Sequence, residues 1–167
     1  ASIEQLLEQA TNAKTPEKAA LLRLSAADLA YQQNNPGRSS QILAQVPLDA
    51  LKPAAQVFAS TLAAELAMGR NQPKAALAAL NHPSLQSLKE LPTDQQIRTG
   101  TVHARAYEAD GQTLAAARER VAMAPLLTGE AASSNHEAIW VLIAALPAEQ
   151  LQACLLYTSP SPRDRTR

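Results

Sequence analysis

Hydrophobic residues recur at steps of three and four along residues 1–153, the spacing of one buried face on an α-helix. Proline residues and small polar clusters interrupt this pattern, and proline is tolerated only in the first turn of a helix. The pattern therefore predicts a succession of helices joined by turns. The segments predicted to be helical are 2–13, 15–31, 42–46, 53–66, 74–80, 85–88, 93–107, 114–121, 133–143 and 148–153.

Three of these helices have recognisable starting residues. Ser2 is expected to cap the first helix, and Thr15 is expected to cap the second, with Pro16 in its first turn. Ser133 or Ser134 is expected to cap the helix that carries Trp140. These residues fit because a side-chain oxygen can accept a hydrogen bond from an otherwise unpaired backbone N–H at a helix start.

One helix end and its turn occur three times. The sequences LAYQQNNP (residues 29–36) and LAMGRNQP (residues 66–73) are similar, and AYEADG (residues 106–111) resembles both. Matching them aligns Tyr31 with Met68 and Tyr107, at offsets of 37 and 39 residues. These offsets are slightly longer than the roughly 34-residue tetratricopeptide period and lie within the range of helical repeats.

The third copy is the most similar to a tetratricopeptide repeat, because Tyr107, Gly111 and Ala116 have the spacing of its tyrosine, glycine and alanine positions. The tyrosine fills space between paired helices, the glycine permits a tight turn, and the small alanine lets the second helix lie close to the first. The first two copies depart from the consensus. Their residues at these positions are Asn35 and Ser40 in the first copy, and Met68, Gln72 and Leu77 in the second.

Composition supports helices over strands. Hydrophobic residues make up 46% of the chain, largely as Ala and Leu, whereas aromatic residues make up only 3% and there are 5 glycines. We therefore expect an all-α fold, a tetratricopeptide-like helical solenoid of antiparallel helix pairs, as one domain over residues 1–153.

Charge and length exclude some partners. Lys and Arg together number 15, as do Asp and Glu, so the net charge gives no attraction to nucleic acid. No apolar run approaches the roughly 18–20 residues of a membrane-spanning helix. The chain begins at Ala1 without an initiator Met, so the removal of a leader remains open.

The helical pattern stops at Cys154, where the sequence becomes CLLYTSPSPRD followed by Arg165, Thr166 and Arg167. This string resembles the in-frame translation of a transposase-type sequencing adapter. We therefore expect residues 154–167 to be non-native and the natural sequence to continue beyond Ala153. The alternative is a native Pro/Ser-rich linker with a basic end.

Candidate chemistry is sparse, and we assign no catalytic, cofactor-binding or metal-binding residue. The three histidines, His82, His103 and His136, are far apart, and only His103 is expected in the middle of a helix. No glycine-rich phosphate loop or Gly-x-Ser-x-Gly motif occurs. Trp140 is expected in the core rather than at an interface. The charged residues expected on solvated helix faces are Asp28, Glu65, Glu108, Glu137, Arg98, Arg105, Arg118 and Arg120.

Several segments together resemble the N-terminal domain of the LpoA family of penicillin-binding-protein activator lipoproteins. The segments are APLL (residues 124–127), HEAIW (residues 136–140), Leu146-Pro147, residues 18–31 and residues 66–80. The resemblance implies a tetratricopeptide-like periplasmic domain of an outer-membrane lipoprotein that stimulates a class A penicillin-binding protein, a peptidoglycan synthase. It also implies a lipid-bearing cysteine upstream and a separate C-terminal domain, with a periplasmic-binding-protein-like fold, that contacts the synthase.

Two other functions fit the same helical architecture. The chain fits the superhelical region of a lytic transglycosylase, whose lysozyme-like catalytic domain would follow Ala153. It also fits a generic tetratricopeptide adaptor that binds peptides in a groove. Architecture alone does not decide between these functions, and the sequence does not identify an interaction surface.

Overall fold

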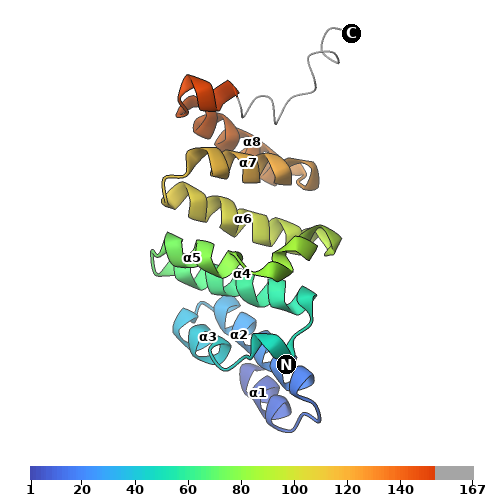
Figure 1. The fold of residues 1–167 in the computed structure, drawn as a ribbon. Helices are drawn as coiled ribbons and strands as arrows, with labels where there is room; N and C mark the ends of the chain where they lie inside the picture. The colour runs from blue at the N-terminus through green and yellow to red at the C-terminus, as the bar shows by residue number, and fades with distance from the viewer. Residues whose placement is uncertain (153–167) are drawn as a thin grey trace. The chain divides into compact units, whose positions relative to one another are not determined.

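The computed structural model describes residues 1–152, and all the regular elements in that range are helical (Figure 1). The α-helices are α1 (Ile3–Thr11), α2 (Pro16–Gln32), α3 (Pro36–Leu43), α4 (Pro53–Gly69), α5 (Pro73–Leu80), α6 (Thr93–Ala109), α7 (Thr113–Met123) and α8 (Gly129–Ala144). The 3-10 helices that interrupt them are η1 (Leu48–Ala50), η2 (Pro83–Glu90) and η3 (Ala124–Leu126). The predicted all-α fold of antiparallel helix pairs is confirmed. The predicted adapter-like tail, residues 154–167, lies outside the described residues.

Two helix starts follow the sequence prediction closely. Ser2 forms a capping box, in which its hydroxyl oxygen accepts a hydrogen bond from the Gln5 N–H (3.2 Å) and Gln5 Oε1 accepts one from the Ser2 N–H (2.9 Å). Thr15 Oγ1 accepts a hydrogen bond from the Lys18 N–H (3.1 Å), and Pro16 occupies the first helical position. These contacts satisfy backbone groups that a helix start leaves unpaired.

The start of α8 differs from the prediction. The helix begins at Gly129, so Ser133 and Ser134 lie inside it and neither is the cap. Gly129 has a φ of +59°. The Ser133 hydroxyl donates to the Gly129 carbonyl (3.4 Å), as serine does within a helix. The earlier start places His136 in the middle of the helix rather than in its first turn, so His103 is not the only mid-helix histidine.

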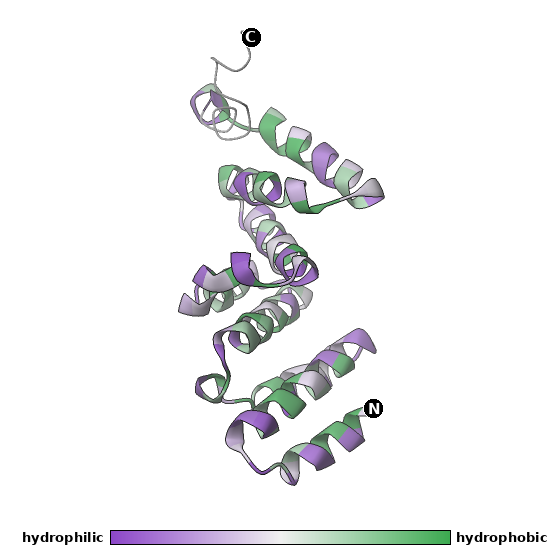
Figure 2. Cartoon of the chain, turned by 90° about the vertical axis from the view of Figure 1, so that its right-hand side faces the viewer, coloured by the Kyte–Doolittle hydropathy of each residue, from purple (hydrophilic) through white to green (hydrophobic). Residues whose placement is uncertain are grey.

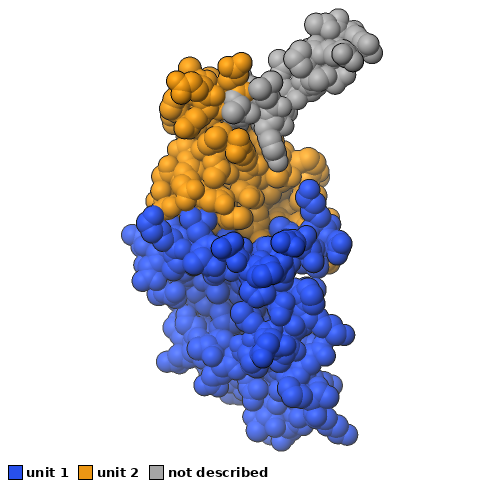
Figure 3. Space-filling view, in the orientation of Figure 1, with its two compact units in different colours: residues 1–91 blue, residues 92–167 orange. Residues whose placement is uncertain are grey.

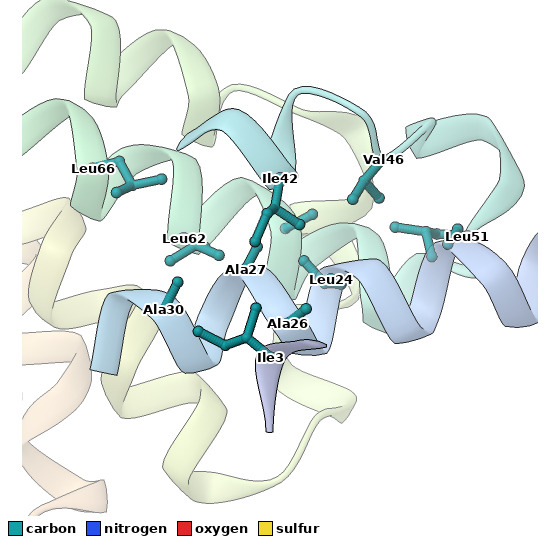
Figure 4. Packing of buried hydrophobic residues seen from close by; sticks show 12 residues of the cluster. Ile3, Leu24, Ala26, Ala27, Ala30, Ile42, Val46, Leu51, Leu62 and Leu66 are labelled. Atoms are coloured by element: carbon teal, nitrogen blue, oxygen red, sulfur yellow. The ribbon is translucent and has the colours of Figure 1, made fainter. Parts of the chain in front are cut away.

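The chain divides into two compact units, residues 1–91 and a second unit that begins at Pro92 (Figure 3). In the first unit, side chains from α1, α2, α3 and α4 converge on one core (Figure 4). Leu62 of α4 is fully buried, and full burial of such a side chain contributes about 1.5–3 kcal/mol. Alanines dominate the α2 contribution, which lets neighbouring helices approach closely. The labelled core residues are Ile3, Leu24, Ala26, Ala27, Ala30, Ile42, Val46, Leu51, Leu62 and Leu66.

The second unit contains α6, α7, η3 and α8. Ala117 of α7 and Ile143 of α8 form the centre of a smaller core cluster. Leu114, Ile139 and Leu142 pack against this centre. As in the first unit, the helices carry hydrophobic and hydrophilic residues on the same element (Figure 2). This pattern is expected of helices that bury one face and expose the other.

Candidate functional site

Three helix pairs share one backbone plan. Helices α2, α4 and α6 each have 17 residues, and in each case the partner helix, α3, α5 or α7, begins after a three-residue turn. The middle residue of each turn has a left-handed conformation, with φ of 64° at Asn34, 59° at Asn71 and 77° at Gly111. Glycine and asparagine are the residues that adopt this conformation most readily.

The hydrogen bonds of the three turns are also the same. The N–H groups of Asn35, Gln72 and Gln112 donate to the carbonyls of Ala30, Ala67 and Tyr107, each at 2.9 Å. The N–H of each left-handed residue donates to the carbonyl three residues earlier, at 2.9–3.2 Å. Together these bonds form a Schellman motif, which satisfies carbonyls at the end of the first helix.

This geometry corrects the alignment read from the sequence. Gly111 matches Asn34 and Asn71, so 37 residues separate the first two turns and 40 separate the second and third. Sequence matching had placed Asn35 and Gln72 opposite Gly111. The error is one residue in the first two copies, because the LAYQQNNP and LAMGRNQP strings align well with each other but not with AYEADG.

The corrected register brings small buried residues into equivalence. Ala116 is fully buried in α7, and its equivalents Ser39 in α3 and Ala76 in α5 are fully buried as well. On the first helix of each pair the fully buried equivalents are Ala27, Ala64 and Ala104. The Ser39 hydroxyl donates to the Ala27 carbonyl (2.7 Å), which satisfies the one polar group in this set. Small residues at these positions allow close helix contact.

The aromatic repeat position behaves differently in the three copies. Tyr107 corresponds to Ala30 and Ala67, whereas Tyr31 and Met68 correspond to Glu108. Tyr107 is half-buried and stacks on His103, with ring centroids 4.6 Å apart. Tyr31 packs against the core of the first unit.

A polar network joins α6, α7 and α8. Arg120 donates two hydrogen bonds to Glu108, from Nε to Oε2 at 2.7 Å and from Nη2 to Oε1 at 3.0 Å. Asn135 is 4% exposed, accepts a hydrogen bond from Arg120 Nη1 (3.3 Å) and donates to the Arg120 carbonyl (2.9 Å). Paired, hydrogen-bonded charges are the form in which charges are tolerated inside proteins. The prediction that Glu108 and Arg120 lie on solvated faces was therefore wrong.

A second polar cluster lies beside Tyr107. His103 Nδ1 lies 3.4 Å from Glu119 Oε1. Burial lowers the pKa of the His103 imidazole and raises the pKa of the Glu119 carboxyl. Burial, together with the negative charge of Glu119, raises the pKa of the Tyr107 hydroxyl. Each of these pKa shifts favours the uncharged form of its group, because a charged group loses its hydration when it is buried.

Trp140 is exposed rather than buried in the core. It is 55% exposed on α8, and its neighbour Val141 is 70% exposed. The Trp140 Nε1–H donates to His136 Nε2 (2.9 Å), one turn earlier on the same helix. Ile139, Leu142 and Ile143 do take core positions, so the apolar run was read correctly except for the residue that faces outward.

The remaining candidate residues are dispersed. Asp28, Glu65 and Arg98 are half-buried rather than solvated, whereas Glu137, Arg105 and Arg118 are exposed as expected. His82 lies at the start of η2, where its Nδ1 accepts a hydrogen bond from the Ser84 N–H (3.2 Å).

Two kinds of feature are absent from residues 1–152 of the structure. No group of three His, Cys, Asp or Glu side chains there is arranged to hold a metal ion. None of the helices in that range is long and apolar enough to cross a membrane.

Comparison with known proteins identifies the family. The family model described as "LppC putative lipoprotein" matches residues 1–157. The chain belongs to the LppC lipoprotein family. A search of curated proteins found no match.

Solved structures share the fold. The amino-terminal domain of E. coli LpoA has a TM-score of 0.61 and 20% identity, over 90% of this chain and 65% of that domain. Full-length Haemophilus influenzae LpoA has a TM-score of 0.57 and 19% identity, over 92% of this chain and 27% of that protein. This chain therefore spans about a quarter of the length of full-length LpoA. TM-scores of 0.57 and 0.61 show a common fold at these low identities, and the sequence resemblance to the LpoA family is confirmed.

Proposed function

We propose that this chain is the helical-repeat arm of an envelope lipoprotein that activates a class A penicillin-binding protein. The observation that carries the proposal is the match to the LppC family over residues 1–157, together with the LpoA-like fold. Neither the transglycosylase nor the generic adaptor has comparable support, since both rest on helical architecture alone.

The internal construction of the chain supports a non-catalytic role. The Arg120–Glu108–Asn135 network links three helices, and Ser39 joins α3 to α2. Both sets of contacts fix helices relative to one another within a unit. Groups held in this way suit a rigid spacer or contact surface, which is what repeat domains commonly provide.

The finer parts of the proposal come from the family resemblance. The partner is a peptidoglycan synthase in the periplasm, and the contact is made by a C-terminal domain with a periplasmic-binding-protein-like fold. A lipidated cysteine upstream of the helical arm anchors the protein in the outer membrane. The helical arm positions the activating domain and binds the synthase weakly or not at all by itself.

Sequencing of the source gene on both sides of the chain tests this organisation first. We expect a lipidation motif upstream of Ala1 and, downstream of Ala153, a binding-protein-like domain in place of the adapter-like string. A lysozyme-like downstream domain would instead identify a lytic transglycosylase. Native codons for residues 154–167 in the source gene would refute the adapter interpretation.

Activity is then tested with the full-length lipoprotein. Purified class A synthase is assayed for glycan polymerisation and cross-linking with the whole protein, with a variant lacking residues 1–152 and with a variant lacking the downstream domain. We expect stimulation from the first two proteins and none from the third. Stimulation that survives loss of the downstream domain would contradict this division of roles. In cells, we expect both deletions to abolish activation of the synthase, because the helical arm positions the activating domain at the synthase.

A further inference from the structure

A pocket of about 350 Å³ lies in the first unit, between α3, α5 and the outer face of α4. Its walls are mostly aliphatic. Leu48, which stands at its edge in η1, is 38% exposed. The lining residues are Leu43, Val46, Leu48, Ala59, Ser60, Ala63, Ala78, Ala79, Asn81 and His82. The volume falls at the lower end of the roughly 300–1,000 Å³ range of ligand pockets.

The pocket exists because this helix pair lacks side chains that its neighbour along the sequence has. With the turns in register, Ser60 corresponds to Gly100, Ala63 to His103 and Ala79 to Glu119. In the α6/α7 pair, Met123 covers Gly100 so closely that an added Cβ would lie 2.7 Å from its side chain. His103 and Glu119 approach each other there as well.

Helix α5 ends before it reaches the position equivalent to Met123, so no side chain of α5 occupies that position. Helix α5 stops at Leu80 after 8 residues, whereas α7 continues for 11. His82 then starts η2, and the chain leaves the helix path. Two alanines, Ala63 and Ala79, and a shorter helix therefore leave space where the α6/α7 pair is filled.

Polar groups in this space are unpaired. Ser60 is 4% exposed, and its hydroxyl makes no hydrogen bond within residues 1–152. No solvent-inaccessible side-chain nitrogen or oxygen in that part of the chain lacks a partner, so solvent reaches the Ser60 hydroxyl through the pocket it lines. His82 uses only Nδ1, which contacts Ser84, and Nε2 has no partner among the described residues. The Asn81 side-chain amide is likewise unpaired there.

We propose that this pocket binds the aliphatic side chain of a peptide together with the adjoining peptide amide. The aliphatic walls favour a branched apolar group, and the Ser60 hydroxyl, Asn81 amide and His82 imidazole supply hydrogen bonds to an amide. No Lys, Arg, Asp or Glu lines the pocket, so a charged ligand would lose hydration without gaining a counter-ion. The ligand is therefore neutral. This inference does not depend on synthase activation.

The test uses the whole chain labelled with ¹⁵N and N-acetyl-leucine-N′-methylamide as the probe. Saturable shifts of the backbone amides of Ser60, Ala79 and His82 are expected at millimolar probe. Free leucine, which is zwitterionic, should bind at least tenfold more weakly. The absence of saturable shifts would overturn the site, and equal binding of free leucine would overturn the neutral ligand class.

Variants separate the pocket from non-specific contact. Ala79→Leu fills the pocket and should abolish the shifts, whereas Ala75→Leu, exposed one turn earlier on α5 and outside the pocket, should keep them. Ser60→Ala should weaken binding about five- to tenfold, as expected for loss of one hydrogen bond. Binding that survives Ala79→Leu, or that is unaffected by Ser60→Ala, would overturn the proposal. Circular dichroism of each variant checks that the helices remain.

Discussion

The α4/α5 and α6/α7 helix pairs have the same backbone geometry but carry side chains of different size and charge at equivalent positions. Both have a 17-residue first helix, a Schellman turn and a fully buried alanine near the start of the second helix. The first pair has small side chains and a pocket where the second has Met123, His103 and Glu119. The first also has Met68 and Leu80 where the second has the Glu108–Arg120 ion pair.

The difference shows which positions the fold requires and which it leaves free. In every copy the middle residue of the turn has a left-handed backbone conformation, which Gly and Asn adopt most readily. The residues at the contact between the two helices are small in every copy, because larger side chains would push the helices apart. The positions between them accept aliphatic, aromatic or charged groups. Distinct surfaces can therefore be built on one repeated frame, and the pocket belongs to these variable positions.

Removal of the Met123 side chain should have the largest effect. Met123→Ala removes a side chain that is 4% exposed and packed on Gly100, and such a cavity costs about 2–4 kcal/mol. Urea unfolding followed by the fluorescence of Trp140, the single tryptophan, measures the second unit directly. Val141→Ala, at a 70% exposed position, is the control and should change stability by less than about 0.5 kcal/mol. Equal effects of the two substitutions would show that Met123 is not a packing residue.

The ion pair should be replaceable by the residues of the other helix pair, but only as a pair. Arg120→Leu alone leaves Glu108 without its bidentate partner and should cost about 2–3 kcal/mol. Glu108→Met combined with Arg120→Leu copies Met68 and Leu80 and should return stability to within about 1 kcal/mol of the parent. Denaturant midpoints of the two singles and the double give the coupling energy. Additive losses would mean that the charges act independently.

Substitutions at the left-handed turn residue Gly111 should change the free energy of unfolding by less than the substitutions above. Apart from Gly111 itself and its two chain neighbours, no residue comes within 4 Å of a Cβ built on Gly111, so only the backbone conformation is tested there. Gly111→Ala should cost about 1 kcal/mol, and Gly111→Asn should cost less than about 0.5 kcal/mol, because Asn34 and Asn71 already occupy equivalent positions. Thermal unfolding measures both. A greater loss with Asn than with Ala would refute the equivalence of the three turns.

The sequence predicted the helices well because their signals are local. Pro16 and Pro73 lie at the starts of predicted helices, and the apolar spacing between breaks is regular. The helix predicted at 42–46 was misplaced, because α3 begins six residues earlier, at Pro36, and ends at Leu43. The exact repeat register was harder to find, since it is set by the left-handed turn residue, which is Asn in two copies and Gly in the third, so no single residue type marks it. The Asn34/Asn71/Gly111 alignment was available as a signal, but the more prominent Tyr31 and Tyr107 obscured it.

The polar contacts were harder to predict. Glu108 and Arg120 are twelve positions apart, and only the turn between α6 and α7 brings them together. Trp140 was misplaced because periodicity does not distinguish a core position from its neighbour at the edge of the apolar face. The pocket had no sequence signal of its own, because it arises from alanines and from the early end of α5.

Glu119 provides the smallest and most specific test of the comparison, since its equivalent in α5 is Ala79. Burial raises the pKa of Glu119 in the folded state above the value of 4.5 for the free group, so the ionised carboxylate opposes folding at neutral pH. Glu119→Gln should therefore stabilise the chain slightly at pH 7–8. The gain should shrink as the pH falls through the raised pKa of Glu119, because protonation of the folded carboxyl removes the cost of burying its charge.

Denaturant midpoints between pH 4.5 and 8 measure this gain, with the exposed Glu137→Gln as the control that should stay near zero throughout. His103 contributes with the opposite sign, because burial lowers its pKa and the parent loses stability as the pH falls below 6.5. Both the parent and the Glu119→Gln variant contain His103, so its contribution cancels when their stabilities are subtracted, unless His103 pairs with Glu119. A gain at pH 8 that becomes a loss near pH 6 would mean that protonated His103 and ionised Glu119 form a stabilising ion pair. In that case the α6/α7 pair would have a stabilising ion pair at the position where the α4/α5 pair has its pocket.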